Sequence, residues 1–248
     1  MGGWLPDHIR WRFASRSHHS RLDAFARRAA ASLSEGARVL DAGAGDCRYQ
    51  KHFRQAIYES ADFCQVKKPY GEITYVCDLR ALPVEASRYD LVLMTQVLEH
   101  LAEPLEVLGE LHRVLKPGGT LWLSAPLQHE EHEEPYDFFR YTQFGLRHVL
   151  QRAGFQVVEL EWTEGYFGTL AYELVLASDH LPLKPRAYGG GLIGVLMGVM
   201  AVPLRGLFLG LSALFTWMER RHRHVHAAHC KNYSVVAQKP RPAAAQRP

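Results

Sequence analysis

Short apolar runs alternate with helix-spaced apolar positions along most of the chain. Near the N-terminus, apolar residues recur every three or four positions, which predicts a helix with this apolar face: Leu22, Phe25, Ala26, Ala29, Ala30 and Leu33. Seven later runs predict strands: Arg38–Asp41, Ile57–Asp62, Thr74–Cys77, Tyr89–Met94, Thr120–Ala125, Gln156–Trp162 and Tyr233–Gln238. Because strands and helical patterns alternate, we expect βαβ units and a mostly parallel sheet.

The clearest helical pattern lies between the fourth and fifth predicted strands. Pro104 suits a first helical position, where its missing N–H would have no partner in any case. Four leucines within 105–115 trace one face, and the sequence Lys-Pro-Gly-Gly at 116–119 then predicts the end of the helix.

Composition and charge fit a globular α/β protein. Hydrophobic residues make up 47% of the 248 residues and charged residues 22%, which excludes a disordered chain. The formal net charge of +3 and the lack of a basic, aromatic-lined patch argue against a nucleic-acid partner. We expect four regions: an N-terminal arm and helix at 1–36, a main domain at 37–163 and 232–240, an apolar helical insertion at 164–231, and a disordered tail at 241–248.

The most apolar stretch of the chain lies inside this insertion, at 191–218. Pro203 is expected to divide it into two helices. The first helix carries glycines at 190, 194 and 198, a spacing that permits close packing. The second is amphipathic, with one polar stripe: Arg205, Ser212, Thr216 and Glu219.

Chain topology limits how this stretch could meet a membrane. The chain must return from the insertion to the last strand of the same sheet. Two full spans would need about 40 residues, more than 191–218 provides. We therefore expect 191–224, which ends in the basic run Arg-Arg-His-Arg-His, to lie on a membrane surface. The alternative is that these helices bury themselves on the domain or in a homodimer.

The cysteines and the first residues bear on location. Cys47, Cys64, Cys77 and Cys230 form no CxxC pair and show no zinc spacing, which favours free thiols in a reducing cytosol. The first residues contain no apolar run of signal-peptide length. We expect a cytoplasmic protein, peripheral on the inner face of the membrane.

A glycine-rich turn follows the first predicted strand in the segment 39–49, VLDAGAGDCRY. Gly43 and Gly45 allow the backbone to turn tightly and to approach a ligand without an intervening Cβ. The N-terminus of the following helix offers free N–H groups. One such turn is a weak signal, because any glycine-rich strand-to-helix connection can produce it.

Further polar residues end the neighbouring strands. Asp62 ends the second strand, Asp78 follows the third, and Gln96 follows the fourth. Ligands of open parallel sheets bind outside the carboxyl ends of the strands, where the strand order reverses. Together with Asp41, these residues therefore predict one crevice with several polar side chains.

The order of the motifs resembles class I methyltransferases that use S-adenosylmethionine, in particular their type 11 group. The segments that carry the resemblance are VLDAGAG, then Asp62, CDL at 77–79, YDLVLMTQVLEHL at 89–101 and LHRVLKPGGTLWLS at 111–124. It covers about 38–162 and the final strand. It implies an α/β, Rossmann-like fold: a seven-stranded, mostly parallel sheet with an antiparallel last strand and helices on both faces.

The resemblance also implies roles for individual residues toward S-adenosylmethionine. The turn would hold the methionine end, the acidic residue after the second strand would hold the ribose, and the CDL segment would meet the adenine. Carried over by position, the implied cofactor-binding residues are Asp41, Gly43, Gly45, Asp62, Asp78, Leu79 and Gln96.

Cys47 departs from the family pattern, which often has a third glycine there. A side chain at that position narrows the turn. It leaves open the alternative that the chain is a non-catalytic cofactor-binding or scaffold protein that keeps the fold. The same missing glycine argues against a nicotinamide-dependent oxidoreductase, which expects GxGxxG.

The segment 126–142, PLQHEEHEEPYDFFRYT, follows the fifth predicted strand and is expected to face the methyl acceptor. His132 is our candidate catalytic general base because an imidazole titrates near neutral pH. Candidate residues for binding a small-molecule or lipid-linked, cell-envelope acceptor are His100, Asp137, Arg140 and Tyr141. Alternatively, Asp137 and Arg140 form an ion pair that fixes the loop, and Tyr141 belongs to the core.

The same segment contains His-Glu-Glu-His at 129–132, which has metal-ligand residue types. Only two residues separate the histidines, not the three of a zincin helix, and Pro135 follows closely. We therefore predict a loop here and no metal site.

Overall fold

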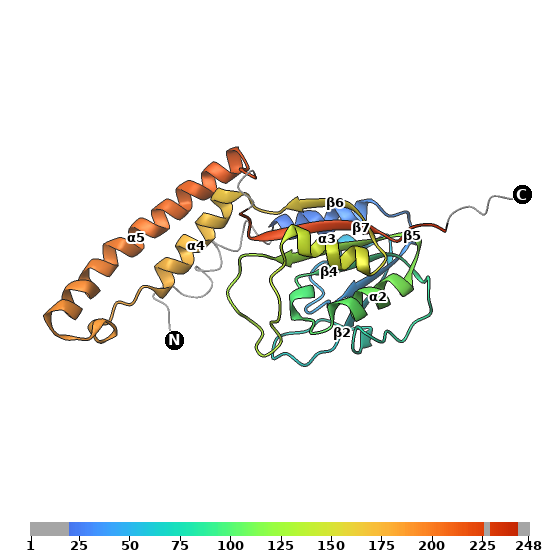
Figure 1. The fold of residues 1–248 in the computed structure, drawn as a ribbon, viewed down its shortest axis with the longest axis horizontal. Coiled ribbons are helices and arrows are strands. Elements are labelled where there is room, and N and C mark those ends of the chain that lie inside the picture. Colours follow the sequence, from blue (N-terminus) through green and yellow to red (C-terminus); the bar gives the residue numbers. More distant parts are fainter. Residues whose placement is uncertain (1–19, 226–228, 243–248) are drawn as a thin grey trace, which may run out of the picture. The chain divides into compact units, whose positions relative to one another are not determined.

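The computed structural model describes residues 20–225 and 229–242. Its contacts divide the chain into two compact units, one built around Leu22–Trp162 with the final strand and the other around Thr163–Lys231. We call them the α/β unit and the helical unit (Figure 1). The predicted arm and tail at 1–19 and 243–248 lie outside the described residues.

The α/β unit is a seven-stranded sheet in the order β3-β2-β1-β4-β5-β7-β6. Neighbouring strands from β3 to β5 are parallel, whereas β7 is antiparallel to both β5 and β6. This confirms the predicted sheet with its antiparallel last strand. The strands are β1 Arg38–Ala42, β2 Ile57–Asp62, β3 Tyr75–Val76, β4 Tyr89–Thr95, β5 Leu115–Pro126, β6 Gln156–Trp162 and β7 Asn232–Gln238.

The fifth strand starts earlier than the predicted Thr120. The segment 116–119 ends the preceding helix α2 (Pro104–Val114), as expected, but continues as extended chain in β5. It is held there because the N–H of Gly118 donates to the carbonyl oxygen of Lys239 and Leu115 pairs with Tyr89. The third strand is shorter than predicted and spans only Tyr75–Val76.

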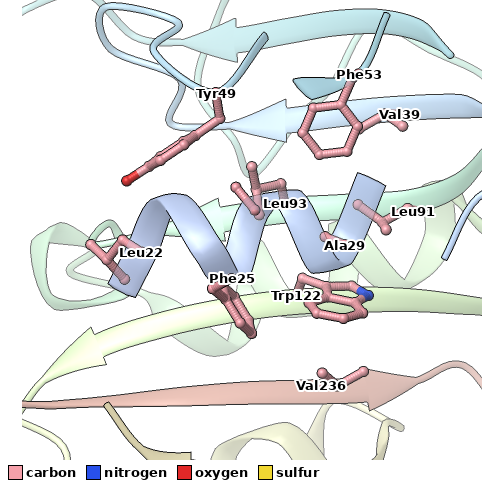
Figure 2. Packing of buried hydrophobic residues seen from close by; sticks show 11 residues of the cluster. Leu22, Phe25, Ala29, Val39, Tyr49, Phe53, Leu91, Leu93, Trp122 and Val236 are labelled. Atoms are coloured by element: carbon pink, nitrogen blue, oxygen red, sulfur yellow. The ribbon is translucent and has the colours of Figure 1, made fainter. Parts of the chain in front are cut away.

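The predicted N-terminal helix forms over 20–31 and packs on the sheet with its apolar face (Figure 2). Phe25 lies against Trp122 of β5, with ring centroids 5.0 Å apart. Leu22 and Ala29 are also buried there, beside Leu93 of β4. The helices α2 and α3 (Gln143–Arg152) complete the layers of this unit, with short 3-10 turns η1 (Gln50–His52) and η2 (Leu98–His100) at strand ends.

The order of strands places a topological switch beside β1. The chain runs from β1 to β2 and β3 on one side, and then crosses to β4 on the other side of β1. Connections leave the carboxyl ends of β1 and β4 in opposite directions, and ligands of open α/β sheets bind at such a switch point. The glycine turn after β1 and Gln96 after β4 lie at these ends.

The helical unit consists of α4 (Tyr166–His180), the 3-10 turn η3 (Pro185–Tyr188) and α5 (Gly191–Arg221). The prediction that Pro203 divides the apolar stretch into two helices is wrong, because α5 runs through it without interruption. A proline removes one backbone hydrogen bond, and the turns on both sides retain theirs. The result is one helix of 31 residues.

The glycine face of α5 packs against the segment that precedes it. A Cβ on Gly194 would lie 2.5 Å from the carbonyl oxygen of Pro185, and one on Gly198 would lie 2.8 Å from that of Leu183. Real side chains do not fit at such distances. The glycine spacing thus permits close packing, as expected, and the partner is the segment that precedes α5.

Candidate functional site

The turn after β1 has the backbone conformation that its glycines predict. Gly43 and Gly45 have φ of +77° and +54°, in the left-handed region that favours glycine. A Cβ on Gly43 would lie 2.4 Å from a methyl carbon of Val97, the residue that follows Gln96. The turn after β1 therefore meets the turn after β4 with no room for a side chain.

Cys47 adopts a left-handed backbone conformation that favours glycine, with φ of +54°. Its N–H donates to the carbonyl oxygen of Ala44, and its thiol lies 3.7 Å from the carbonyl oxygen of Glu72. A Cβ on Gly71 would lie 2.8 Å from the Cys47 sulfur. The extra side chain is thus accommodated by a glycine on the neighbouring loop, and the tight turn is retained. Burial raises the pKa of the thiol, so Cys47 is a buried neutral group.

Asp62, the candidate ribose ligand, is buried at the end of β2. One carboxylate oxygen accepts from the N–H of Gly45 at 3.0 Å, and the other accepts from the N–H of Cys64 at 2.9 Å. Each oxygen keeps a further lone pair. Asp62 therefore fixes the glycine turn and can still accept hydrogen bonds from a diol.

Asp41 lies at the end of β1 with 1% of its surface exposed. Burial raises the pKa of its carboxyl to about 7, although the hydroxyl of Tyr58 donates to it at 2.6 Å and opposes the shift. Asp62 and Asp46 add to the rise through charge repulsion. A cationic ligand beside this carboxyl would favour its ionised form, and S-adenosylmethionine carries a sulfonium and an ammonium. Sequence reasoning missed Tyr58, whose only signal is its place on the strand beside β1.

The two residues of the CDL segment differ in exposure. Leu79 is buried, whereas the carboxylate of Asp78 is half exposed and pairs with the guanidinium of Arg80. This pairing lowers the pKa of Asp78, which is therefore ionised. Its free lone pairs suit an amino-group donor, and Leu79 supplies the apolar neighbour that an adenine ring requires.

Gln96 follows β4 in a strained conformation, with φ of +55°. Its backbone N–H donates to the carbonyl oxygen of Ser124, and its side-chain amide donates to the Ser124 hydroxyl at 3.2 Å. Both bonds tie the turn after β4 to the neighbouring strand β5. A strained non-glycine residue held by two bonds at a strand end is typical of a ligand site.

Three of the predicted acceptor residues, Asp137, Arg140 and Tyr141, lie in the segment after β5, whereas His100 lies in the turn after β4. Arg140 uses all five of its N–H donors: two on the Asp137 carboxylate at 2.6 and 2.8 Å, and one each on the carbonyl oxygens of His129, Phe139 and Glu130. The guanidinium keeps the pKa of Asp137 well below its usual range. As arranged, the pair fixes the loop, and an acceptor anion would have to replace one of these bonds.

Tyr141 is buried, and its hydroxyl donates to the carbonyl oxygen of Leu98 at 3.4 Å. His100 and His132 lie with their rings at 82° and 4.7 Å between centroids, so the loop brings the candidate base next to a candidate acceptor ligand. The backbone carbonyl of Glu99 accepts from the N–H groups of Phe138 and Phe139. The Glu99–His100 segment therefore orients the loop 126–142.

The chemical groups around the glycine turn fit S-adenosylmethionine. The space beside Gly45 is open to a ligand, whereas that beside Gly43 is filled by Val97, and three carboxyl groups lie at or just after the ends of β1, β2 and β3. Asp41 would face the cationic end of the cofactor, Asp62 the ribose hydroxyls and Asp78 the adenine amino group. Bound there, the cofactor supplies an electrophilic methyl group.

A profile of the methyltransferase-domain family matches residues 11–160, more than half of the chain. The demethylmenaquinone methyltransferase of Chlamydia muridarum (strain MoPn / Nigg) is 33% identical over 69 residues, which cover 28% of this chain and 29% of that protein. The chain spans only 14% and 29% of the lengths of the two curated relatives that it matches.

Two solved structures share the fold. The [4+2]-cyclase SpnF has a TM-score of 0.55 at 19% identity, with 89% of this chain and 81% of that chain covered. The Burkholderia thailandensis 1,6-didemethyltoxoflavin-N1-methyltransferase, with bound 1,6-didemethyltoxoflavin and S-adenosylhomocysteine, has a TM-score of 0.51 at 19% identity, with 97% and 93% covered. Together with the motifs, the family match shows that the chain belongs to the methyltransferase-domain family.

Proposed function

We propose that this chain is an S-adenosylmethionine-dependent methyltransferase that acts on a small-molecule or lipid-linked acceptor of the cell envelope, at the inner surface of a membrane. The observation that carries the proposal is the orientation of α5, which turns its polar residues toward α4 and its apolar residues outward. Helices of water-soluble proteins have the opposite arrangement.

The buried carboxylate of Glu219 binds the N-terminus of α4. It accepts from the backbone N–H groups of Gly165 at 2.8 Å and Gly168 at 3.2 Å, and from the guanidinium of Arg21 at 3.1 Å. Helix N-termini have unpaired N–H groups and a partial positive charge, so a carboxylate there is stabilising. Glu219 is therefore committed to the interior of the hairpin.

Arg205 binds the C-terminus of α4. Its guanidinium donates to the carbonyl oxygens of Leu181 at 3.0 Å and Asp179 at 3.2 Å, where the helix dipole is negative. Midway between them, the Ser212 hydroxyl donates to the carbonyl oxygen of Ala171 at 2.8 Å. The predicted polar stripe thus faces α4 at three successive points along α5.

The opposite face of α5 is apolar and exposed. This helix is long and apolar enough, by length and composition alone, to cross a membrane: its most apolar 18-residue window has a mean hydropathy of 2.1, and 17% of it is buried. We call the exposed residues the outer apolar face: Leu192, Ile193, Val195, Leu196, Met197, Val199, Met200, Val202, Leu204, Leu207, Leu214 and Trp217. A continuous patch of this kind favours an apolar environment over water.

The topology favours a surface location over a crossing. Trp162, the last residue of β6, pairs with Tyr233 of β7, so the insertion starts and ends at adjacent positions of one sheet. The helix α4, which leads from the sheet to α5, has 15 residues, about 22 Å at ~1.5 Å per residue, which is less than the ~30 Å hydrocarbon core. Because α4 is too short to cross, the hairpin of α4 and α5 favours lying along one leaflet.

Charges at both ends of α5 support an orientation parallel to the surface. Lys184 and Arg186 are exposed before the helix, and Arg220 and Arg221 end it. The Arg221 guanidinium lies over the ring of Trp217 at 5.5 Å from its centroid, a pairing suited to the head-group region. With cations at both ends, the helix can meet anionic head groups along its full length.

The acceptors named for similar proteins agree with a small organic substrate. The curated relative is named for demethylmenaquinone, and the structural neighbour with a bound acceptor holds 1,6-didemethyltoxoflavin. An enzyme whose helical hairpin rests in a leaflet would meet an acceptor that is itself lipid-linked. We therefore favour the lipid-linked class.

Membrane binding is tested by vesicle flotation of the full chain. The wild type should float with vesicles that contain anionic phospholipid, and less with purely zwitterionic ones. The variant Ile193→Asp/Leu196→Asp/Val199→Asp should stay at the bottom of the gradient. The matched control, Phe144→Asp, alters an apolar residue that is 74% exposed on α3, and it should float like the wild type.

Two outcomes would overturn the proposal. If the wild type does not float and is instead a stable dimer that the triple variant breaks, the outer apolar face binds a second copy. For the acceptor, purified enzyme with methyl-labelled S-adenosylmethionine should transfer label to the organic-solvent extract of envelope membranes. Label confined to water-soluble compounds would refute a lipid-linked acceptor.

A further inference from the structure

Three side chains with metal-ligand atoms meet at the carboxyl ends of β4 and β5. Glu99 and His100 belong to the turn η2 after β4, and His132 belongs to the loop after β5. One ligand atom from each lies within 4.8 Å of the others. The cluster was not expected from the sequence, because His132 joins residues more than thirty positions away and not its neighbour in the His-Glu-Glu-His run.

The Glu99 side chain is the unusual member of this cluster. It is fully buried, and neither carboxylate oxygen has a hydrogen-bond partner within the described part of the chain. The nearby Arg140 guanidinium is occupied by Asp137 and by backbone carbonyls. A buried carboxyl without a partner is unfavourable by several kcal/mol, which a bound cation would offset.

In both histidines, one ring nitrogen lies beside a backbone carbonyl and the other remains available to a ligand. His100 Nδ1 lies 2.5 Å from the carbonyl oxygen of Tyr136, and His132 Nδ1 lies 3.1 Å from that of Glu130. A carbonyl can only accept, so Nδ1 carries the proton in both rings, and each Nε2 presents a lone pair. His100 Nε2 is 3.7 Å from a Glu99 oxygen, too far for a hydrogen bond.

We propose that Glu99, His100 and His132 bind a divalent transition-metal ion, with Zn²⁺ as the best match. Two imidazole nitrogens and one carboxylate oxygen form a common ligand set for such ions and leave coordination positions open. Hydrogen bonds from Nδ1 to backbone carbonyls are the outer contacts that orient metal-binding histidines. A tetrahedral ion with bonds of ~2.1 Å holds its ligand atoms about 3.4 Å apart, so side chains whose ligand atoms lie within 4.8 Å of one another would close in by about 1 Å on binding.

The location indicates what the ion would serve. Glu99 lies three residues after Gln96, so the cluster borders the turn that is implied to hold the methionine end of the cofactor. An open coordination position there would bind and orient an oxygen of the acceptor. This role rests on the proposed function, whereas metal binding itself does not.

Binding is tested with the chelator-stripped full chain and Co²⁺, whose visible absorption reports nitrogen and oxygen ligands. Because the His-rich run at 222–224 could bind metal by itself, the background is His222→Ala/His224→Ala. We expect one equivalent of Co²⁺ with visible bands, displaced by Zn²⁺. Glu99→Gln and His132→Ala should each weaken binding by about 100-fold. His148→Ala, an exposed histidine on α3, should bind like the background chain.

The outcomes are distinct from those of the acceptor assay. Absence of Co²⁺ binding in the background chain, with Glu99 behaving only as a protonated acid, would overturn the proposal. Equal binding by the background chain and Glu99→Gln would overturn it too. Circular dichroism confirms that each variant is folded, and His132→Ala, at a partly exposed position, gives a second test if Glu99→Gln misfolds.

Discussion

The helix over 20–31 and α5 have the same helical periodicity but opposite relations to their surroundings. The first packs Leu22, Phe25 and Ala29 against the sheet. The second packs Arg205, Ser212 and Glu219 against α4 and exposes its apolar residues. An amphipathic pattern therefore gives the position of a stripe on a helix, and only the partner decides whether that stripe faces inward.

Truncating one leucine on each helix should give the largest difference between the two. Leu22 is 3% exposed and Leu192 is 86% exposed. Leu22→Ala removes buried contacts and should lower the free energy of unfolding by about 3 kcal/mol, whereas Leu192→Ala should change it by less than about 0.5 kcal/mol. Urea unfolding in the absence of lipid measures both. Equal losses would show that the outer apolar face is buried in solution.

Glu219→Ala tests the contact between the polar face of α5 and α4. The substitution leaves the N–H groups of Gly165 and Gly168 and the guanidinium of Arg21 without their acceptor. The local stability of α4 should fall by about 3 kcal/mol, measured as faster amide hydrogen exchange there. Ser212→Ala removes one neutral hydrogen bond and should cost only about 1 kcal/mol. A loss of the same size in both variants would contradict the capping role.

The pH dependence of stability should come from the α/β unit. The pKa values of Asp41 and Glu99, about 7 and about 8, are above those of the unfolded chain, so folding favours their protonated forms. Their contribution is complete at low pH and is lost as pH rises toward 8. With chelator present, the free energy of unfolding should fall by up to about 6 kcal/mol between pH 5 and pH 8 if both carboxyls keep these pKa values. In Asp41→Asn/Glu99→Gln the decline should be much shallower.

The smallest expected effect concerns the strained turn. Cys47→Gly relieves a left-handed conformation but loses buried contacts and adds freedom to the unfolded chain, so the free energy of unfolding should change by less than about 0.5 kcal/mol. Calorimetric titration should show unchanged affinity for S-adenosylmethionine. Cys47→Val, β-branched at φ of +54°, should instead lower stability by about 2 kcal/mol and weaken binding.

Much of the α/β unit could be predicted because its signals are local. The run Ile57–Asp62 forms β2 with the predicted bounds, and Gly43 adopts the positive φ that its turn requires. The side-chain chemistry of the acceptor loop could not be predicted, since Glu99 becomes buried only when a distant segment folds over it. Likewise, the sequence indicates the stripe that contains Arg205, but only the packed structure shows that it faces α4.

The pairing of Trp162 with Tyr233 makes the whole insertion equivalent to the loop of a β-hairpin. A sheet constrains only the two ends of such a loop, so its length and contents can change without altering the strands that carry the glycine turn. The helical unit and the sheet can therefore change independently in evolution. In an engineered chain, a short turn in place of Thr163–Lys231 should remove the proposed membrane binding and leave the sheet folded.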